Sequence, residues 1–228
     1  MKKIIVRLAN GLGNQLFTYA AAYACAKKNN AQLFVDEESG FYKRHKYELN
    51  NFKISSPIVE KKHKFTGIAG RVRRKILIKV NYLKKNKNFL IEKRNKNKLT
   101  FYDNNFFDTK LSDTVYFEGY YQTEKYFSNF KENILSEFLF QDSIINQKNS
   151  FVDKIKKNNA ISIHIRQDKF LKDEGHKDIE KLNKDNFDLN IEIAKKGINY
   201  FDQNTDSPIY FVWSNNFKGL REIFPSNK

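Results

Sequence analysis

The fold is decided by residues 3–36, KIIVRLANGLGNQLFTYAAAYACAKKNNAQLFVD, near the start of a chain of 228 residues. An apolar run at 4–8 predicts a buried strand, a glycine-containing loop follows at 10–14, and apolar residues then recur at helical spacing as far as Lys28. The run QLFVD at 32–36 predicts a second strand. Strand, helix and strand at this spacing are typical of a parallel sheet with a crossover helix, so we expect an α/β fold.

The remainder of the chain predicts further elements of the same two kinds. We expect strands at 115–117, 161–166 and 209–213, and helices at 68–83, 124–140 and 186–201. A polar, charged stretch at 146–159 is typical of a domain boundary, so the sequence predicts an N-terminal domain over 1–150 and a C-terminal domain over 151–228. The second domain contains only two clear strands, too few for a complete doubly wound domain.

The positive charge of the chain is concentrated in one segment. Lys and Arg number 42 and Asp and Glu 26, a formal net charge of +16, but the segment 61–98 alone carries fifteen basic residues and one acid, Glu92. Apolar residues recur there every three or four positions, which predicts an amphipathic helix. We expect this basic insertion to lie on an anionic membrane surface, where each basic residue contributes about 1 kcal/mol. The alternatives are a bias of the whole chain towards lysine, and a nucleic-acid-binding protein.

Several classes of protein are disfavoured by composition. With one cysteine, Cys25, and four scattered histidines, the sequence predicts neither an internal disulfide nor a structural zinc site. It contains no Asp-x-Asp pair, so metal-dependent transfer is not expected. No apolar run approaches the roughly 18 residues of a membrane span, and the start of the chain lacks the apolar region of a signal peptide. We therefore expect a cytoplasmic protein, peripheral on the inner face of the cytoplasmic membrane if the basic insertion binds lipid.

The loop 10–15, NGLGNQ, is the first candidate site. It follows a strand and opens a helix, as in the dinucleotide-binding motif, but the third glycine of that motif is absent. Backbone N–H groups around Gly11 and Gly13 can still receive an anion or a sugar hydroxyl. Asn14 and Gln15 add amide donors. A tight turn with helix caps is the alternative interpretation.

Two later strands also end in candidate binding residues. In ISIHIR at 161–166, the alternation places His164 and Arg166 on the face opposite three isoleucines, with Arg166 at the carboxyl end, where open α/β sheets bind ligands. A permanently charged guanidinium group there suits a phosphate or pyrophosphate. The last strand runs into Ser214 and Asn215, which can hydrogen-bond a nucleoside. The alternatives are an arginine that only meets solvent, a structural histidine and a helix cap.

Taken together, several segments of the chain resemble the bacterial α-1,2-fucosyltransferases. The resemblance rests on NGLGNQLFTYA at 10–20, YELNNFKI at 47–54, FEGYYQTEKYF at 117–127, HIR at 164–166 and VWSNN at 212–216. Their order and spacing agree with that family over essentially the whole chain, which is more specific than any single segment.

The resemblance implies an inverting, metal-independent transferase with two Rossmann-like, doubly wound domains of the GT-B type and no cofactor. Such enzymes move L-fucose from GDP-fucose to the 2-hydroxyl of a galactoside during synthesis of surface polysaccharide. The acceptor is a galactose-terminated oligosaccharide or a lipid-linked sugar, and nucleic acid is not a partner. In the family's order, 1–150 is the acceptor-side domain and 151–228 is the donor domain.

The resemblance also implies roles for individual residues. Arg166 would neutralise the pyrophosphate leaving group, with His164 supporting it. Donor contacts are implied for Arg166, Lys169, Ser214, Asn215, Gly11, Gly13 and Asn14, and cleft positions on the acceptor side for Gln15, Tyr120 and Gln122. No residue is identified as the general base.

The chain departs from the family pattern in three places. Residues 167–169, QDK, stand where the family has Arg-Gly-Asp, so one pyrophosphate contact is lost or comes from Lys169. Asn215 and Asn216 replace paired acids. The family continues past the position of Lys228 into a segment that helps to build the donor site, which predicts a C-terminally truncated donor domain. An inactive relative that keeps a binding role is therefore the alternative function, and a basic nucleic-acid-binding protein is a weaker one.

Overall fold

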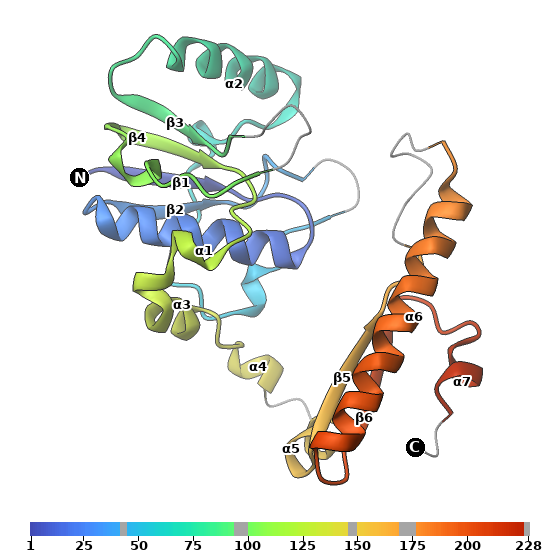
Figure 1. Cartoon of the computed structure of the whole chain (residues 1–228). Helices are drawn as coiled ribbons and strands as arrows, with labels where there is room; N and C mark the ends of the chain where they lie inside the picture. Colours follow the sequence, from blue (N-terminus) through green and yellow to red (C-terminus); the bar gives the residue numbers. More distant parts are fainter. Residues whose placement is uncertain (42–44, 94–99, 146–149, 169–176, 226–228) are drawn as a thin grey trace. The chain divides into compact units, whose positions relative to one another are not determined.

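A computed structural model describes residues 1–41, 45–93, 100–145, 150–168 and 177–225 of the chain. Contacts divide the chain into unit 1, Met1–Asn146, and unit 2, Gln147–Lys228, whereas the sequence predicts a boundary after residue 150. Figure 1 labels the helices and strands of both units. Within the described residues, no helix is long and apolar enough to cross a membrane.

Unit 1 is built on a parallel sheet of four strands in the order β2-β1-β4-β3 (Figure 1). The strands are β1 (Lys3–Arg7), β2 (Gln32–Asp36), β3 (Lys87–Ile91) and β4 (Leu111–Glu118). The central strand β1 pairs in parallel with β2 and β4, and β3 pairs in parallel with β4. The carboxyl ends of all four strands therefore meet at one edge of the sheet, where Arg7 lies opposite Asp36.

Side chains cover both faces of this sheet. On one face, α1 (Leu12–Lys28) packs its buried alanines against the apolar side chains of β1. On the other, Phe65 makes ring contacts with Phe89 of β3 and Tyr116 of β4, at centroid distances of 6.0 and 4.7 Å. The chain then enters α2 (Gly67–Asn81), which packs beside β3. Coverage on both faces explains why the strands are apolar at successive positions.

One predicted helix of unit 1 is wrong over its first half. The sequence predicts a helix over 124–140, but the chain forms two 3₁₀ turns, Glu124–Tyr126 and Ser128–Phe130, before α3 (Lys131–Glu137). Phe127, between the turns, has φ −142° and ψ 10°, which no α-helix contains. Aromatic side chains of this stretch pack against the core, and their contacts override the helical spacing of the sequence.

Unit 2 contains, among its described residues, a parallel sheet of two strands. The strand β5 (Ala160–Ile165) pairs along its whole length with β6 (Ile209–Ser214). The helix α6 (Ile179–Asn204) covers one face of this sheet and begins earlier than the predicted residue 186. A shorter helix, α5 (Ser150–Lys157), packs beside β5. The short helix α7 (Leu220–Ile223) also belongs to unit 2. In unit 1, the other described elements are α4 (Asp142–Ile145) and the 3₁₀ turns Leu49–Asn51, Lys61–His63 and Phe106–Asp108.

Cys25 lies in the core of unit 1. Its side chain is 1% exposed, and burial raises the pKa of its thiol to about 12. Because the thiolate is the reactive species, we expect Cys25 to resist alkylation by iodoacetamide at about pH 8 until the protein unfolds. Mass spectrometry of samples treated with and without urea checks this expectation. Equal rates of modification in the two samples would contradict it.

Candidate functional site

The carboxyl ends of β5 and β6 meet in unit 2, and candidate residues follow both strands. Ile165 pairs with Ser214 in the sheet, so Arg166 and Asn215 continue from neighbouring positions. Arg166 is exposed, and among the described residues no side chain pairs with its guanidinium group. Lys169, the other predicted cation, lies outside the described residues. The strand ends thus present a positive charge beside polar groups, an arrangement suited to an anion.

Gln167 holds the two strand ends together. Its backbone N–H donates to Oδ1 of Asn215 at 2.9 Å, and its Nε2 donates to the carbonyl oxygens of Asn216 at 2.7 Å and Lys218 at 3.0 Å. The Ser214 hydroxyl donates to the carbonyl oxygen of Asn216 at 2.5 Å and accepts from its N–H at 3.1 Å. Gln167 is therefore a brace between the strands, and the Ser214 hydroxyl is engaged within its own turn.

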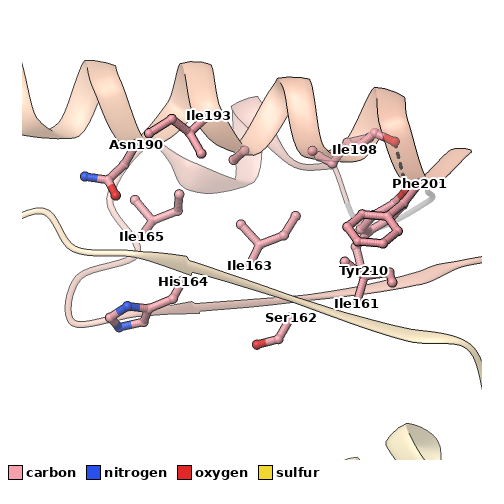
Figure 2. Close-up of a pocket in the computed structure, with 12 residues that line it drawn as sticks. Ile161, Ser162, Ile163, His164, Ile165, Asn190, Ile193, Ile198, Phe201 and Tyr210 are labelled. Carbon is pink, nitrogen blue, oxygen red and sulfur yellow. Dashed lines mark hydrogen bonds between the residues drawn. The ribbon is translucent and has the colours of Figure 1, made fainter. Parts of the chain in front are cut away.

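His164 lies on the exposed face of β5. The alternation of the strand buries Ile163 and Ile165 against α6, as predicted. It leaves Ser162 and His164 exposed, and Figure 2 shows both side chains pointing away from α6. Arg166 is the next position of this polar row, directly after the strand. His164 therefore lies on the same exposed side of β5 as the predicted site residue Arg166.

A hollow of about 210 Å³ opens between α6 and β5 (Figure 2). Aliphatic and aromatic side chains line most of it, including Ile163, Ile193 and Phe201. The Tyr210 hydroxyl lies in the wall of this hollow. It is 3.1 Å from the carbonyl oxygen of Ile198 and 2.7 Å from Oδ1 of Asp202 on α6, so this polar group is already hydrogen-bonded. The lining includes none of the charged groups at the strand ends, which remain the better candidate site.

In unit 1, the start of α1 and the loop after β4 lie together at the carboxyl edge of the sheet. Nε2 of Gln122 donates to Oδ1 of Asn14 at 2.6 Å, a contact between positions 108 residues apart. Oγ1 of Thr18 donates to the carbonyl oxygen of Gly119 at 2.9 Å. Tyr120, half-buried, belongs to the same loop. The structure thus brings together Asn14, Gln122 and Tyr120 from two separate motifs.

Gly11 and Gly13 lie at the start of α1. Gly11 is the N-cap residue, and within the described chain no side chain caps this helix. A methyl group added at Gly11 would lie 3.7 Å from the His45 ring, whereas one added at Gly13 would meet nothing within 4 Å. The protein's own packing therefore does not require glycine at position 13. Its open flank, next to Asn14, leaves room for a ligand to approach the backbone.

The Gln15 side chain has a structural role in unit 1. Its side chain is fully buried, and its Nε2 donates to the carbonyl oxygens of Asn10 at 2.8 Å and Lys46 at 2.9 Å. Its Oε1 accepts from the N–H of Glu48 at 3.0 Å. Gln15 therefore braces two backbone segments, which differs from the expected position on the surface of a cleft.

Two acidic residues at this edge make contacts that the sequence does not predict. The buried carboxylate of Glu118, at the end of β4, accepts from Nε of Arg74 at 2.8 Å and lies 3.7 Å from Nη1 of Arg7. The Glu92 carboxylate accepts from the N–H of Tyr120 at 2.7 Å and so fixes the loop after β4. One feature of the sequence could have identified Glu92: it is the single acidic residue in the segment 61–98, which contains fifteen basic residues.

Comparisons with known proteins agree with this architecture. No family model matches the chain. The chain is similar to the alpha-1,2-colitosyltransferase of Escherichia coli, with 25% identity over 226 residues that cover 97% of this chain and 72% of that protein. Among solved structures, it is similar to fucosyltransferase NodZ from Bradyrhizobium, with a TM-score of 0.56 and 13% identity over 98% of this chain and 76% of NodZ. The chain has the NodZ fold.

Two further NodZ crystals match in the same way. One, of the alpha-1,6-fucosyltransferase soaked with GDP-fucose, gives a TM-score of 0.52 at 14% identity over 98% of this chain and 75% of that one. The other, co-crystallised with GDP, gives 0.54 at 13% identity over 98% and 76%. These matches confirm the predicted α/β fold of the GT-B type.

Proposed function

We propose that the chain is a glycosyltransferase that takes fucose from GDP-fucose and attaches it to the 2-hydroxyl of a galactoside acceptor. The observation that carries the proposal is the exposed Arg166 at the carboxyl ends of β5 and β6, in a fold similar to that of a fucosyltransferase soaked with GDP-fucose. Similarity to an alpha-1,2-colitosyltransferase over 97% of the chain supports the α-1,2 linkage. Because NodZ is an alpha-1,6-fucosyltransferase, the fold alone does not determine the linkage.

In the proposed reaction, the candidate residues of the two units have different roles. The acceptor hydroxyl oxygen attacks the anomeric carbon of fucose, the new glycosidic C–O bond forms as the bond from that carbon to the β-phosphate oxygen breaks, and the hydroxyl proton passes to solvent. GDP leaves with a new negative charge on its pyrophosphate. The Arg166 guanidinium group stabilises that charge as it develops on the leaving pyrophosphate. His164 orients the donor beside it. In unit 1, the N–H groups at the start of α1 and the paired amides of Asn14 and Gln122 bind sugar hydroxyls.

The proposed reaction needs neither a metal ion nor a cofactor. A cation is often used to neutralise a leaving pyrophosphate, and Arg166 supplies a positive charge for the same purpose. Transfer in the presence of EDTA at the uninhibited rate supports metal independence, and a loss that Mn²⁺ restores would overturn it.

A direct assay tests the proposed function. The purified chain is incubated with GDP-fucose, or with nucleotide-activated colitose, and with lactose or a galactosyl-GlcNAc acceptor. We expect a product that carries fucose on the 2-hydroxyl of galactose, identified by NMR and by cleavage with an α-1,2-specific fucosidase. Faster transfer of colitose would reassign the donor sugar, and an α-1,6 product would overturn the proposed linkage. Thermal stabilisation by GDP without any product would indicate an inactive relative that still binds nucleotide.

Gly13→Ala is expected to separate ligand binding from folding. Alanine is favoured over glycine in a helix by roughly 0.5–1 kcal/mol, and the added methyl group meets no protein atom, so the free energy of unfolding should stay the same or rise. If the sugar approaches the backbone of α1, the methyl group occupies its space and transfer slows by about tenfold. Steady-state kinetics and urea denaturation measure the two effects.

The matched control for this prediction is Gly197→Ala. Gly197 lies inside α6, and an added methyl group there also meets nothing within 4 Å. The control should gain stability and keep its rate of transfer. Equal rates for the two variants would show that no ligand approaches the flank of Gly13.

A further inference from the structure

The helix α2 presents its apolar residues to solvent. Ile68, Val72 and Ile76 are 76%, 50% and 56% exposed, and Leu83, just beyond the helix, is 89% exposed. No residue of α2 is buried. Positions four apart lie on the same side of a helix, so these side chains form one apolar stripe that faces away from the sheet. Unit 1 therefore has a helix whose apolar side is unused by its own core.

The side of α2 that faces the sheet carries polar and small residues beside the less exposed Leu77 and Ile78. Nε of Arg74 donates to the carboxylate of Glu118 on β4 at 2.8 Å. Asn81 pairs with the backbone of Phe89 on β3, since its Nδ2 donates to the carbonyl oxygen at 3.1 Å and its Oδ1 accepts from the N–H at 3.0 Å. At Gly70 the helix is so close to the preceding chain that an added Cβ would lie 2.5 Å from a backbone carbonyl carbon. These contacts fix the rotation of α2 and hold the apolar stripe outside.

Basic residues border the apolar stripe. Lys75 and Lys79 lie along one border, and Arg73 lies along the other. The helix sequence GIAGRVRRKILIKVN contains no acidic residue. Figure 1 shows α2 beside the edge strand β3 of unit 1. Positive charge and apolar surface are therefore combined on the same exposed side of one helix.

We propose that α2 docks unit 1 on an anionic membrane surface. The apolar stripe enters the boundary between headgroups and acyl chains, while Lys75 and Lys79 meet lipid phosphates. An anionic bilayer offers acyl chains to the apolar stripe and phosphates to the lysines. A nucleic acid would leave the apolar stripe without a partner, and an apolar protein groove would leave the lysines without one. The proposal depends on the orientation of α2 alone and not on the proposed transfer of fucose.

Vesicle flotation with the full chain tests the charge requirement. We expect recovery with vesicles of phosphatidylcholine and phosphatidylglycerol and little recovery with phosphatidylcholine alone. Lys75→Gln combined with Lys79→Gln should weaken binding by about tenfold or more, because each lysine near anionic lipid contributes about 1 kcal/mol. The matched control, Lys156→Gln with Lys195→Gln in unit 2, removes the same charge and should bind like the unmodified chain. Equal binding to neutral and anionic vesicles would overturn the proposal.

A second variant tests the apolar stripe. Val72→Ser with Ile76→Ser removes side chains that are already exposed, so folding should be unaffected while vesicle binding falls by about tenfold. The control is Leu135→Ser with Leu139→Ser, whose side chains are 51% and 56% exposed elsewhere in unit 1. If the stripe variant changes the mass measured by sedimentation and leaves vesicle binding intact, the stripe contacts a second copy of the chain and the proposal fails.

A fluorescent label reports where the membrane touches. Because Cys25 is buried, the Ile76→Cys variant has one accessible thiol while it is folded, and a thiol-reactive dye attaches there. An environment-sensitive dye at this position should shift to shorter wavelength when anionic vesicles are added. The same dye at Leu135→Cys should not shift. Similar shifts at both positions, or none at either, would contradict docking through α2.

Discussion

Arg166→Ala is expected to slow sugar transfer by about a hundredfold or more while leaving thermal unfolding unchanged. The guanidinium group is exposed and, among the described residues, no side chain pairs with it, so its removal costs the folded state little. In the proposed reaction its charge faces the leaving pyrophosphate, which becomes more negative in the transition state, so the interaction strengthens there. Rates with GDP-fucose and the thermal midpoint of the same preparations measure the two effects.

Two companion variants sharpen this prediction. Arg166→Lys keeps the charge but loses the planar fork that binds two phosphate oxygens, so its rate should fall between those of the unmodified chain and the alanine variant. Lys195→Ala removes an exposed charge from the middle of α6 and should leave the rate unchanged. A rate for Arg166→Ala within about twofold of the Lys195→Ala rate would remove Arg166 from the proposed mechanism.

Glu118→Gln is expected to lower the free energy of unfolding of unit 1 by about 3 kcal/mol, the size found when one partner of a buried ion pair is removed. The Glu118 side chain is 6% exposed, and its carboxylate contacts both Arg74 and Arg7. Glutamine keeps the shape but removes the negative charge between two guanidinium groups. Urea denaturation followed by circular dichroism measures the loss.

The control for this stability prediction is Glu124→Gln. Glu124 pairs with Lys131 at 3.9 Å, but both side chains are mostly exposed, so the change should cost less than about 0.5 kcal/mol. If the two variants unfold at the same urea concentration, the Glu118 contacts do not stabilise the sheet. If Glu118→Gln unfolds at lower urea, the double variant with Arg74→Met measures how much of the lost free energy of unfolding belongs to the Glu118–Arg74 pair.

The elements that the sequence predicts well are those specified by their own residues. The strand at 32–36 has the same bounds in the structure, because its apolar run is continuous and a helix of regular spacing precedes it. The strand β3 has an apolar run of the same length at 89–91, but this run lies in a basic, asparagine-rich segment, and pairing with β4 makes it a strand. Residues 124–140 have helical spacing, yet packing of their aromatic side chains breaks the first half into turns.

The candidate site divides in the same way. His164 and Arg166 can be placed from the period of one strand, and the parallel pairing of β5 with β6 brings Asn215 to the same edge. The role of Gln15 cannot be obtained in this way, because its partners are backbone groups at Lys46 and Glu48, far along the chain. Glu118 is missed for a similar reason, because its ion pairs are made with arginines that come from another strand and from α2.

At the carboxyl edge of the sheet in unit 1 the strand-end charges are used within the unit, and this bears on the acceptor sugar of the proposed reaction. The charged residues at the four strand ends are engaged by other parts of unit 1: Arg7 with Glu118, Asp36 with the N–H groups of Glu38 and Ser39, and Glu92 with two backbone N–H groups. Among the described residues near this edge, the neutral amides of Asn14 and Gln122 face each other, whereas the exposed Glu38 and Lys93 lie on the loops after β2 and β3. The neutral part of the edge, between the start of α1 and the loop after β4, suits the hydroxyls of the acceptor sugar in the proposed reaction.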